Sequence, residues 1–266
     1  MAKRNRFEYT PAMEPLAERA RRATTNEELA QVCLRMDVAD HVFLGKVDIW
    51  LAKHALSALY RNLKKYPYMR SRMNYFGTLN GFINCQDTIL RESLPPNYVQ
   101  MGVAQMVDQS LDQMCENVRG CFRQNGLAVA VTVPVGSVVI GAVMVNGFSF
   151  HQQSIMQTLA QGEAMGHSPK GCKSVKSVVE HEIGHVLDNL LGIQQHPAFQ
   201  ALLRQCNQYY IATNLSQYAA TSPMEMVAEA YSEYCNNPNP RPLATQIGQL
   251  IDAEYRNRFE RRRWPW

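Results

Sequence analysis

Three ionisable residues lie within five positions of an otherwise apolar stretch of the chain. Residues 177 to 188 read SVVEHEIGHVLD, which places His181, Glu182 and His185 together. Residues four apart on a helix project from the same face, so both imidazoles can reach one ion. Ionisable groups among apolar residues are costly unless a counter-charge compensates them. The types and spacing of these residues therefore predict a metal site.

The pattern is HExxH, in which two histidines bind zinc and the glutamate lies beside the ion. If HExxH were the only motif in the sequence, the alternative to a zinc site would be two histidines on a surface helix that simply make hydrogen bonds. Zinc that does chemistry keeps three protein ligands and one open position, so a third ligand has to follow downstream. Asp188 follows His185 by less than one turn, and we expect it to be a hydrogen-bond partner rather than a ligand.

Glu225 is the better candidate for the third ligand. The segment Ser222-Pro223-Met224-Glu225 also reads as the N-cap, first residue and capping glutamate of a new helix, and a capping glutamate needs no metal. Both roles for Glu225 stay open on local grounds. Glu229 follows one turn later on the same face, where it can accept the outer N–H of a metal-bound imidazole.

Two motifs in register carry a family resemblance. HEIGHVLD, followed about forty residues later by QYAATSPMEMVAEAY, resembles the lethal-factor-type zincin peptidases and related peptidase domains of bacteriophage and prophage head-associated proteins. The resemblance is strong over residues 172 to 235. It implies that His181, His185 and Glu225 bind zinc and that Glu182 is the general base. It also implies that the hydroxyl of Tyr218 stabilises the carbonyl oxygen of the substrate and that the carboxylate of Glu229 lies behind the zinc ligands.

The implied activity is a zinc-dependent endopeptidase, in which Glu182 takes a proton from a metal-activated water that attacks a peptide carbonyl. Its partner would be a protein or peptide substrate, with virion or phage-encoded proteins as further partners. One alternative is a phage or prophage structural or interaction protein with a non-catalytic, zinc-binding peptidase fold. Another is a regulatory peptidase that inactivates a repressor. A net charge of only +4 predicts neither a nucleic-acid nor a membrane partner.

The elements that position these residues are mainly helical. We expect the active helix at about 174–191, closed by Gly192, and the third-ligand helix at about 223–235. Earlier helices are expected at 25–36, opened by the Thr25 capping box, and at 49–65, with mainly helical structure over 99–123. Short strands are expected at 42–47 and 72–77.

Residues 127 to 145 form an uncharged run about as long as a bilayer is thick. The turn-forming residues 134–137 divide this run into two Val-rich pieces, which favours a buried strand pair over a membrane helix. A peptide substrate can be held by adding it to an exposed sheet edge, and Ser137–Asn146 is the expected edge strand.

The combined expectation is an α+β, zincin-like fold with a small mixed sheet packed on the active helix. Residues 1–41 are expected to form a helical extension, and 42–266 a peptidase domain that ends in a helical C-terminal subdomain. Seven scattered cysteines without a Cys-x-x-Cys pair favour a reducing compartment. No secretory signal is apparent, so we expect a cytoplasmic or virion-associated protein.

Overall fold

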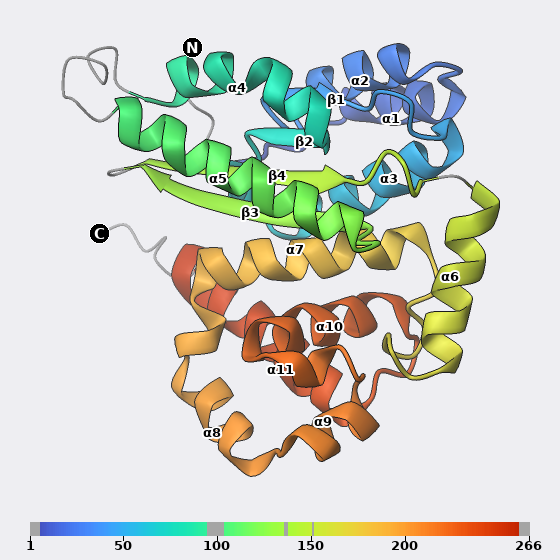
Figure 1. Cartoon of the computed structure of the whole chain (residues 1–266), viewed down its shortest axis with the longest axis vertical. Helices are drawn as coiled ribbons and strands as arrows, with labels where there is room; N and C mark the ends of the chain where they lie inside the picture. Colours follow the sequence, from blue (N-terminus) through green and yellow to red (C-terminus); the bar gives the residue numbers. More distant parts are fainter. Residues whose placement is uncertain (1–5, 95–103, 136–137, 151, 261–266) are drawn as a thin grey trace. The chain divides into compact units, whose positions relative to one another are not determined.

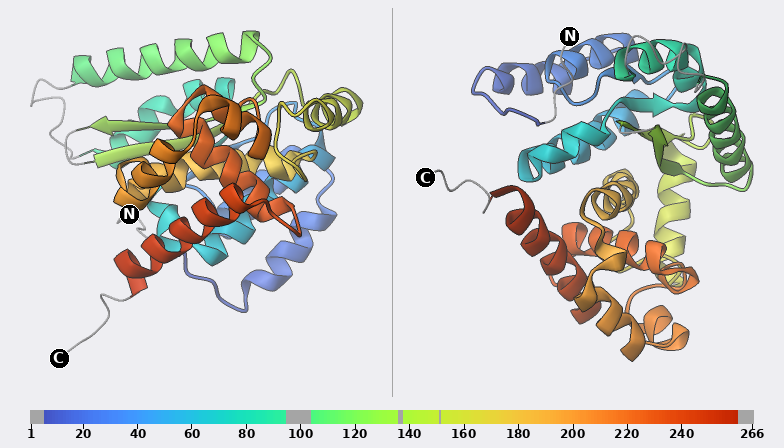
Figure 2. Two further views of the ribbon diagram at one scale, coloured as in Figure 1. Left: turned by 90° about the horizontal axis from the view of Figure 1, so that it is seen from below. Right: turned by 90° about the vertical axis from the view of Figure 1, so that its left-hand side faces the viewer.

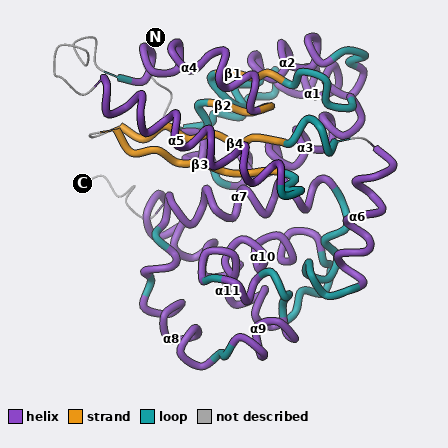
Figure 3. Tube along the Cα trace, viewed as in Figure 1, coloured by secondary structure: helices purple, strands orange, loops and turns teal. Residues whose placement is uncertain are grey.

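The computed structural model describes residues 6–94, 104–135, 138–150 and 152–260. The protein is mixed α+β: helices dominate, and the strands of the described residues form one small sheet (Figures 1 and 3). The chain divides into two compact units. Unit 1 comprises Met1–Leu56 and Tyr60–Gln152, and unit 2 comprises Ser57–Leu59 and Gln153–Trp266. All predicted site residues belong to unit 2.

Unit 1 contains the sheet and the helices that connect its strands. Its helices are α1 (Met13–Arg22), α2 (Asn26–Arg35), α3 (Ile49–Lys65), the 3₁₀ helix η1 (Pro67–Arg72), α4 (Leu79–Ser93) and α5 (Ala104–Arg123). Its strands are β1 (His41–Phe43), β2 (Tyr75–Thr78), β3 (Ala128–Val135) and β4 (Val138–Val145). The strand order is β1-β2-β4-β3, in which β3 alone runs antiparallel to its neighbour.

Helices α4 and α5 cover one face of this sheet, as Figure 2 shows from below. Ile140, Ala142 and Met144 alternate along β4, so their side chains point to the same face. They pack with apolar residues of α4 and α5 such as Phe82 and Leu111. The alternating direction of side chains along β4 and the helical periodicity of α4 and α5 together build this part of the core of unit 1.

The predicted strand pair is confirmed, but the predicted edge strand is wrong. β3 and β4 are separate strands, and β3 includes Pro134 and Val135, which were expected in the turn. Residues 136–137 lie outside the described residues, and with them the start of the expected edge strand Ser137–Asn146. β4 pairs with β2 on one side and with β3 on the other, so its backbone groups are already used. The edge position falls to β3, where Pro134 is tolerated because an edge strand needs fewer N–H donors.

The N-terminal residues differ from the expected separate extension. Among residues 6–41, the described part of this segment, the helices are α1 and α2, and α2 begins at the N-cap Thr25, whose side chain accepts a hydrogen bond from Glu28 N. However, these residues cluster with the sheet in unit 1. The reason is packing, since Leu29, Val32 and Cys33 of α2 are buried.

Unit 2 is helical. Its elements are α6 (Gln152–Ala164), α7 (Val175–Leu191), η2 (Ile193–Gln195), α8 (Pro197–Gln205), α9 (Gln208–Asn214), η3 (Ala219–Thr221), α10 (Pro223–Asn236), α11 (Pro242–Tyr255) and a π-helical turn, η4 (Arg256–Glu260). Helices α7 and α10 lie side by side and form the most extensive helix pair of the unit (Figures 1 and 2).

Two further observations concern the described residues of both units. Among the described residues, no helix is both long enough and apolar enough to cross a bilayer. Each of the seven cysteines, all of them in described segments, is a free thiol.

Candidate metal centre

Local sequence determines where both helices of the site begin and end. Helix α7 opens with a capping box between Ser174 and Ser177 and closes at Gly192, which adopts the left-handed conformation with φ of 66°. Helix α10 opens at Ser222, whose hydroxyl accepts a hydrogen bond from Glu225 N at 3.2 Å, with Pro223 as its first residue. Both boundaries agree with the sequence prediction.

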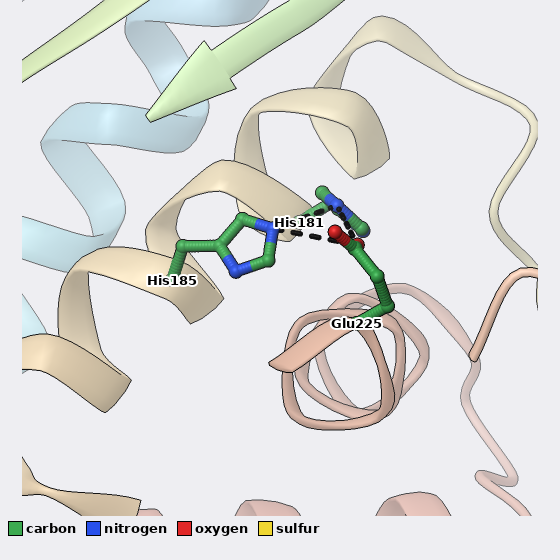
Figure 4. Close-up of side chains that lie close together, drawn as sticks. All are labelled: His181, His185 and Glu225. Carbon is green, nitrogen blue, oxygen red and sulfur yellow. Dashed lines mark hydrogen bonds and ion pairs between the residues drawn. The ribbon is translucent and has the colours of Figure 1, made fainter. Parts of the chain in front are cut away.

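Two side chains of α7 and one of α10 meet at a single point (Figure 4). His181 Nε2 lies 3.1 Å from Glu225 Oε2 and 3.1 Å from His185 Nε2. The third edge of the triangle, from His185 Nε2 to Glu225 Oε2, is 3.5 Å. Glu225 therefore uses its backbone N–H for the helix cap while its carboxylate lies against the two imidazoles.

The three atoms fit a metal ion. Ligands at about 2.0–2.1 Å from a tetrahedral zinc lie roughly 3.3 Å from one another, which is close to the three edges observed. Glu225 Oε2 is buried and has no partner with hydrogen-bond geometry among the described residues, despite its closeness to both rings. Buried polar atoms are rarely left in this state, and a cation between the three atoms would satisfy all of them.

A second carboxylate sets the orientation of His181. Glu229 Oε1 lies 2.7 Å from His181 Nδ1, and Glu229 is buried. An ionised carboxylate can only accept, so Nδ1 donates and Nε2 faces Glu225 and His185. Glu229 thus contacts one ring nitrogen of His181 while the other ring nitrogen faces Glu225 and His185. No equivalent partner binds His185, whose Nδ1 is buried without a hydrogen bond among the described residues.

The electrostatics of the site favour a cation. Burial lowers the pKa of His181, but the close contact with the Glu225 carboxylate, the hydrogen bond to Glu229 and the charges of Glu229 and Glu182 outweigh burial and raise this pKa well above its ordinary value. Burial raises the pKa of Glu225, but its contacts with His181 and His185 outweigh that effect and lower the pKa to about 2. Three carboxylates around one imidazole leave an excess of negative charge that a divalent ion would compensate.

The remaining predicted residues lie around this triangle. Glu182 is buried, and it follows His181 directly on α7. The ring of Tyr218 stacks on His181 with ring centroids 5.8 Å apart and an interplanar angle of 27°. Tyr218 is 38% exposed, so part of its side chain is open to solvent. The ring of Tyr218 also lies near that of His167, with ring centroids 5.6 Å apart.

Asp188 is the one predicted residue that lies outside the group. Its carboxylate oxygens accept hydrogen bonds from the backbone N–H and the side-chain amide of Gln194, so they hold the turn after α7. Conversely, sequence reasoning missed Ser216, which is fully buried and donates to Glu229 Oε2 at 2.7 Å. No spacing rule links a loop serine to a helix residue 13 positions later, so this contact had no signal in the sequence.

Comparison with known proteins found no matching family model, no matching curated protein and no matching solved structure. What the site can do must therefore follow from its own side chains.

Proposed function

We propose that this protein is a zinc-dependent endopeptidase whose centre lies in unit 2. One observation supports it most strongly: His181 Nε2, His185 Nε2 and Glu225 Oε2 converge with edges of 3.1 to 3.5 Å. Two imidazoles and a carboxylate are a ligand set that catalytic zinc sites use, with a fourth position left open. The same residues match the two motifs of the lethal-factor-type zincins, which makes that family the proposed one.

The chemistry divides between the ion and the chain. Zinc held by these three residues would supply Lewis acidity, which makes water acidic enough to lose a proton near neutral pH. Glu182 is proposed to accept this proton and to pass it to the leaving amine. Tyr218 is proposed to donate its O–H to the carbonyl oxygen, on which negative charge develops. Glu229 keeps His181 in the orientation in which Nε2 points to the shared centre.

The deciding experiment pairs metal analysis of the purified protein with cleavage of an unbiased peptide library. We expect about one zinc per chain and cleavage that a chelator abolishes. Glu182→Gln should keep the zinc and lose roughly 10²- to 10⁴-fold in kcat/KM, the usual contribution of a positioned general base. Glu254→Gln is a matched control in the same unit. Glu254 lies on α11 rather than on α7 or α10, and its carboxylate pairs with Arg258.

Two results would contradict the proposal. Cleavage by Glu182→Gln at the wild-type rate would remove Glu182 from the mechanism. Folded, zinc-loaded wild type that cleaves no peptide would favour the non-catalytic binding role instead.

A further inference from the structure

Ser216 is a buried residue whose hydroxyl makes two hydrogen bonds, one as donor and one as acceptor. It is 0% exposed. Its Oγ donates to Glu229 Oε2 at 2.7 Å and accepts from Ala219 N at 2.9 Å. A hydroxyl has only one proton to donate, and an ionised carboxylate can only accept, so the direction of the first bond follows from the chemistry of the pair. Hydrogen bonds to charged groups are the stronger kind.

Glu229 is therefore held at both oxygens. Ser216 binds one of them, and His181 Nδ1 binds the other at 2.7 Å. A carboxylate fixed at both ends has one orientation, and that orientation decides which nitrogen of His181 carries the proton. Ser216, Glu229 and His181 form a chain of buried hydrogen bonds that ends at Nδ1 of His181, the ring nitrogen opposite the one that faces Glu225 and His185.

The loop that carries Ser216 is itself anchored. Arg241 donates through its guanidinium to the carbonyl oxygen of Leu215, the residue before Ser216. The same guanidinium pairs with Glu233, which is fully buried, at 2.6 Å. After Ser216, the backbone N–H of Gln217 donates to the carbonyl oxygen of Gly166 at 2.9 Å. Bonds on both sides thus hold Ser216 in place.

We propose that Ser216 is a positioning residue for the metal centre. It acts through Glu229 to hold His181 with Nδ1 protonated and Nε2 free for the ion. Tyr218, the residue proposed to contact substrate, follows two residues later in the same anchored loop. Ser216 therefore connects this loop, through hydrogen bonds, to the proposed metal ligand His181. This inference rests on the metal site of the proposed function and extends it to a residue in none of the motifs.

The test is the zinc affinity of Ser216→Ala, measured by competition with a chelating indicator. Loss of an outer partner of a metal-bound histidine weakens metal binding by about 10- to 100-fold, and we expect roughly the lower end for Ser216→Ala, since Glu229 itself remains. Ser232→Ala is the matched control. Ser232 is also buried, and its hydroxyl donates to the carbonyl oxygen of Ser177 at 2.8 Å rather than to Glu229. Its zinc affinity should equal that of the wild type.

A double-mutant cycle separates positioning from a general effect on the fold. If Ser216 acts through Glu229, Ser216→Ala should cost nothing further in zinc affinity in a Glu229→Ala background. An equal loss in both backgrounds, or a Ser216→Ala affinity equal to that of the wild type, would overturn the inference.

The protonation of His181 can also be tested on the wild-type protein, so this test does not depend on whether a variant folds. The ¹⁵N spectrum of the zinc-loaded protein should show His181 protonated at Nδ1, and an unprotonated Nδ1 would refute the inference. Zinc binding with the expected affinity pattern but no peptide cleavage would contradict only the proposed peptidase activity and would support the role of Ser216. A folded wild type that binds no zinc would overturn both.

Discussion

At the scale of single residues, the site depends on one glutamate with two uses. The backbone N–H of Glu225 completes the N-cap of α10, while its carboxylate lies between two imidazoles. The capping pattern in the sequence would turn the Glu225 carboxylate back to the backbone N–H of Ser222. In the structure the backbone N–H of Glu225 takes part in the cap, and the carboxylate turns to the imidazoles instead.

Proton competition gives this site a defined pH dependence. Burial lowers the pKa of His181, but its contacts with the carboxylates of Glu225 and Glu229 outweigh burial and raise this pKa well above its ordinary value. Below that pKa the ring holds a proton at Nε2 that a metal has to displace, whereas Glu225, with a pKa of about 2, stays ionised. Apparent zinc affinity should therefore fall as pH is lowered, by up to about tenfold per pH unit for each proton displaced.

Competition titrations at a series of pH values would measure this slope. Glu229→Gln should flatten it, because the neutral amide stabilises protonated His181 less than a carboxylate does. An affinity that does not change with pH in the wild type would rule out a proton on the ligand set.

At the scale of elements, the close crossing of α7 and α10 brings the three proposed metal ligands, His181, His185 and Glu225, within reach of one another. The crossing lies at Gly184, between the two histidines. A Cβ built on Gly184 would lie 2.7 Å from Ala228 Cα and 3.3 Å from Tyr231 Cβ. Ala228 is adjacent to Glu229 and lies one turn after Glu225, so the spacing of the helices at this point sets the spacing of the ligand atoms. Small residues at both positions permit the approach.

Gly184→Ala should consequently separate the helices. The added methyl meets backbone, which cannot move aside as a flexible side chain can, and overpacking of this kind costs about 1–3 kcal/mol of unfolding free energy. Zinc affinity should fall as well, since Glu225 moves away from the histidines. Denaturant unfolding and zinc titration would measure the two effects.

Gly120→Ala is the control for this substitution. A Cβ at Gly120 of α5 meets no atom within 4 Å, so this variant should be neutral or gain up to about 1 kcal/mol from helix propensity. Wild-type stability and zinc affinity in Gly184→Ala would show that the crossing does not control the site.

At the scale of the whole molecule, the proposed chemistry belongs to one of two compact units. His181, His185, Glu225, Glu229 and Tyr218 all lie in unit 2, whereas the sheet lies in unit 1. A ligand stabilises the part of a protein that holds it, by about 2.7 kcal/mol when its concentration is a hundred times the dissociation constant. Local stability can differ between parts of one chain, so this effect can be located.

Hydrogen exchange with and without zinc should therefore distinguish the units. Amide protection should rise in α7 and α10 and stay unchanged in β2 and α4, as read by mass spectrometry of peptic fragments. The variant Glu225→Ala, which lacks one ligand, should show no response to zinc. Equal gains in protection in both units would mean that zinc stabilises the molecule as a single cooperative structure.

The sequence alone determined the local features of this protein. Ser174, Gly192, Ser222 and Pro223 mark helix ends that the structure reproduces, and the Val-rich run forms two strands as predicted, although the first of them continues through Pro134 and Val135. HExxH spacing placed two imidazoles on one face of a helix. These features depend on residues within about one turn of each other, where backbone geometry fixes which groups meet.

Only the tertiary structure decided what depends on contacts between distant residues. It paired β4 on both sides, so β3 became the edge, although both strands have similar Val-rich sequences. It bonded Asp188 to Gln194 and gave Glu229 a second partner in Ser216, 13 residues away. It also aimed the Glu225 carboxylate at histidines more than thirty positions earlier. Such contacts are set by how helices and strands pack, because local spacing does not specify which distant surfaces come together.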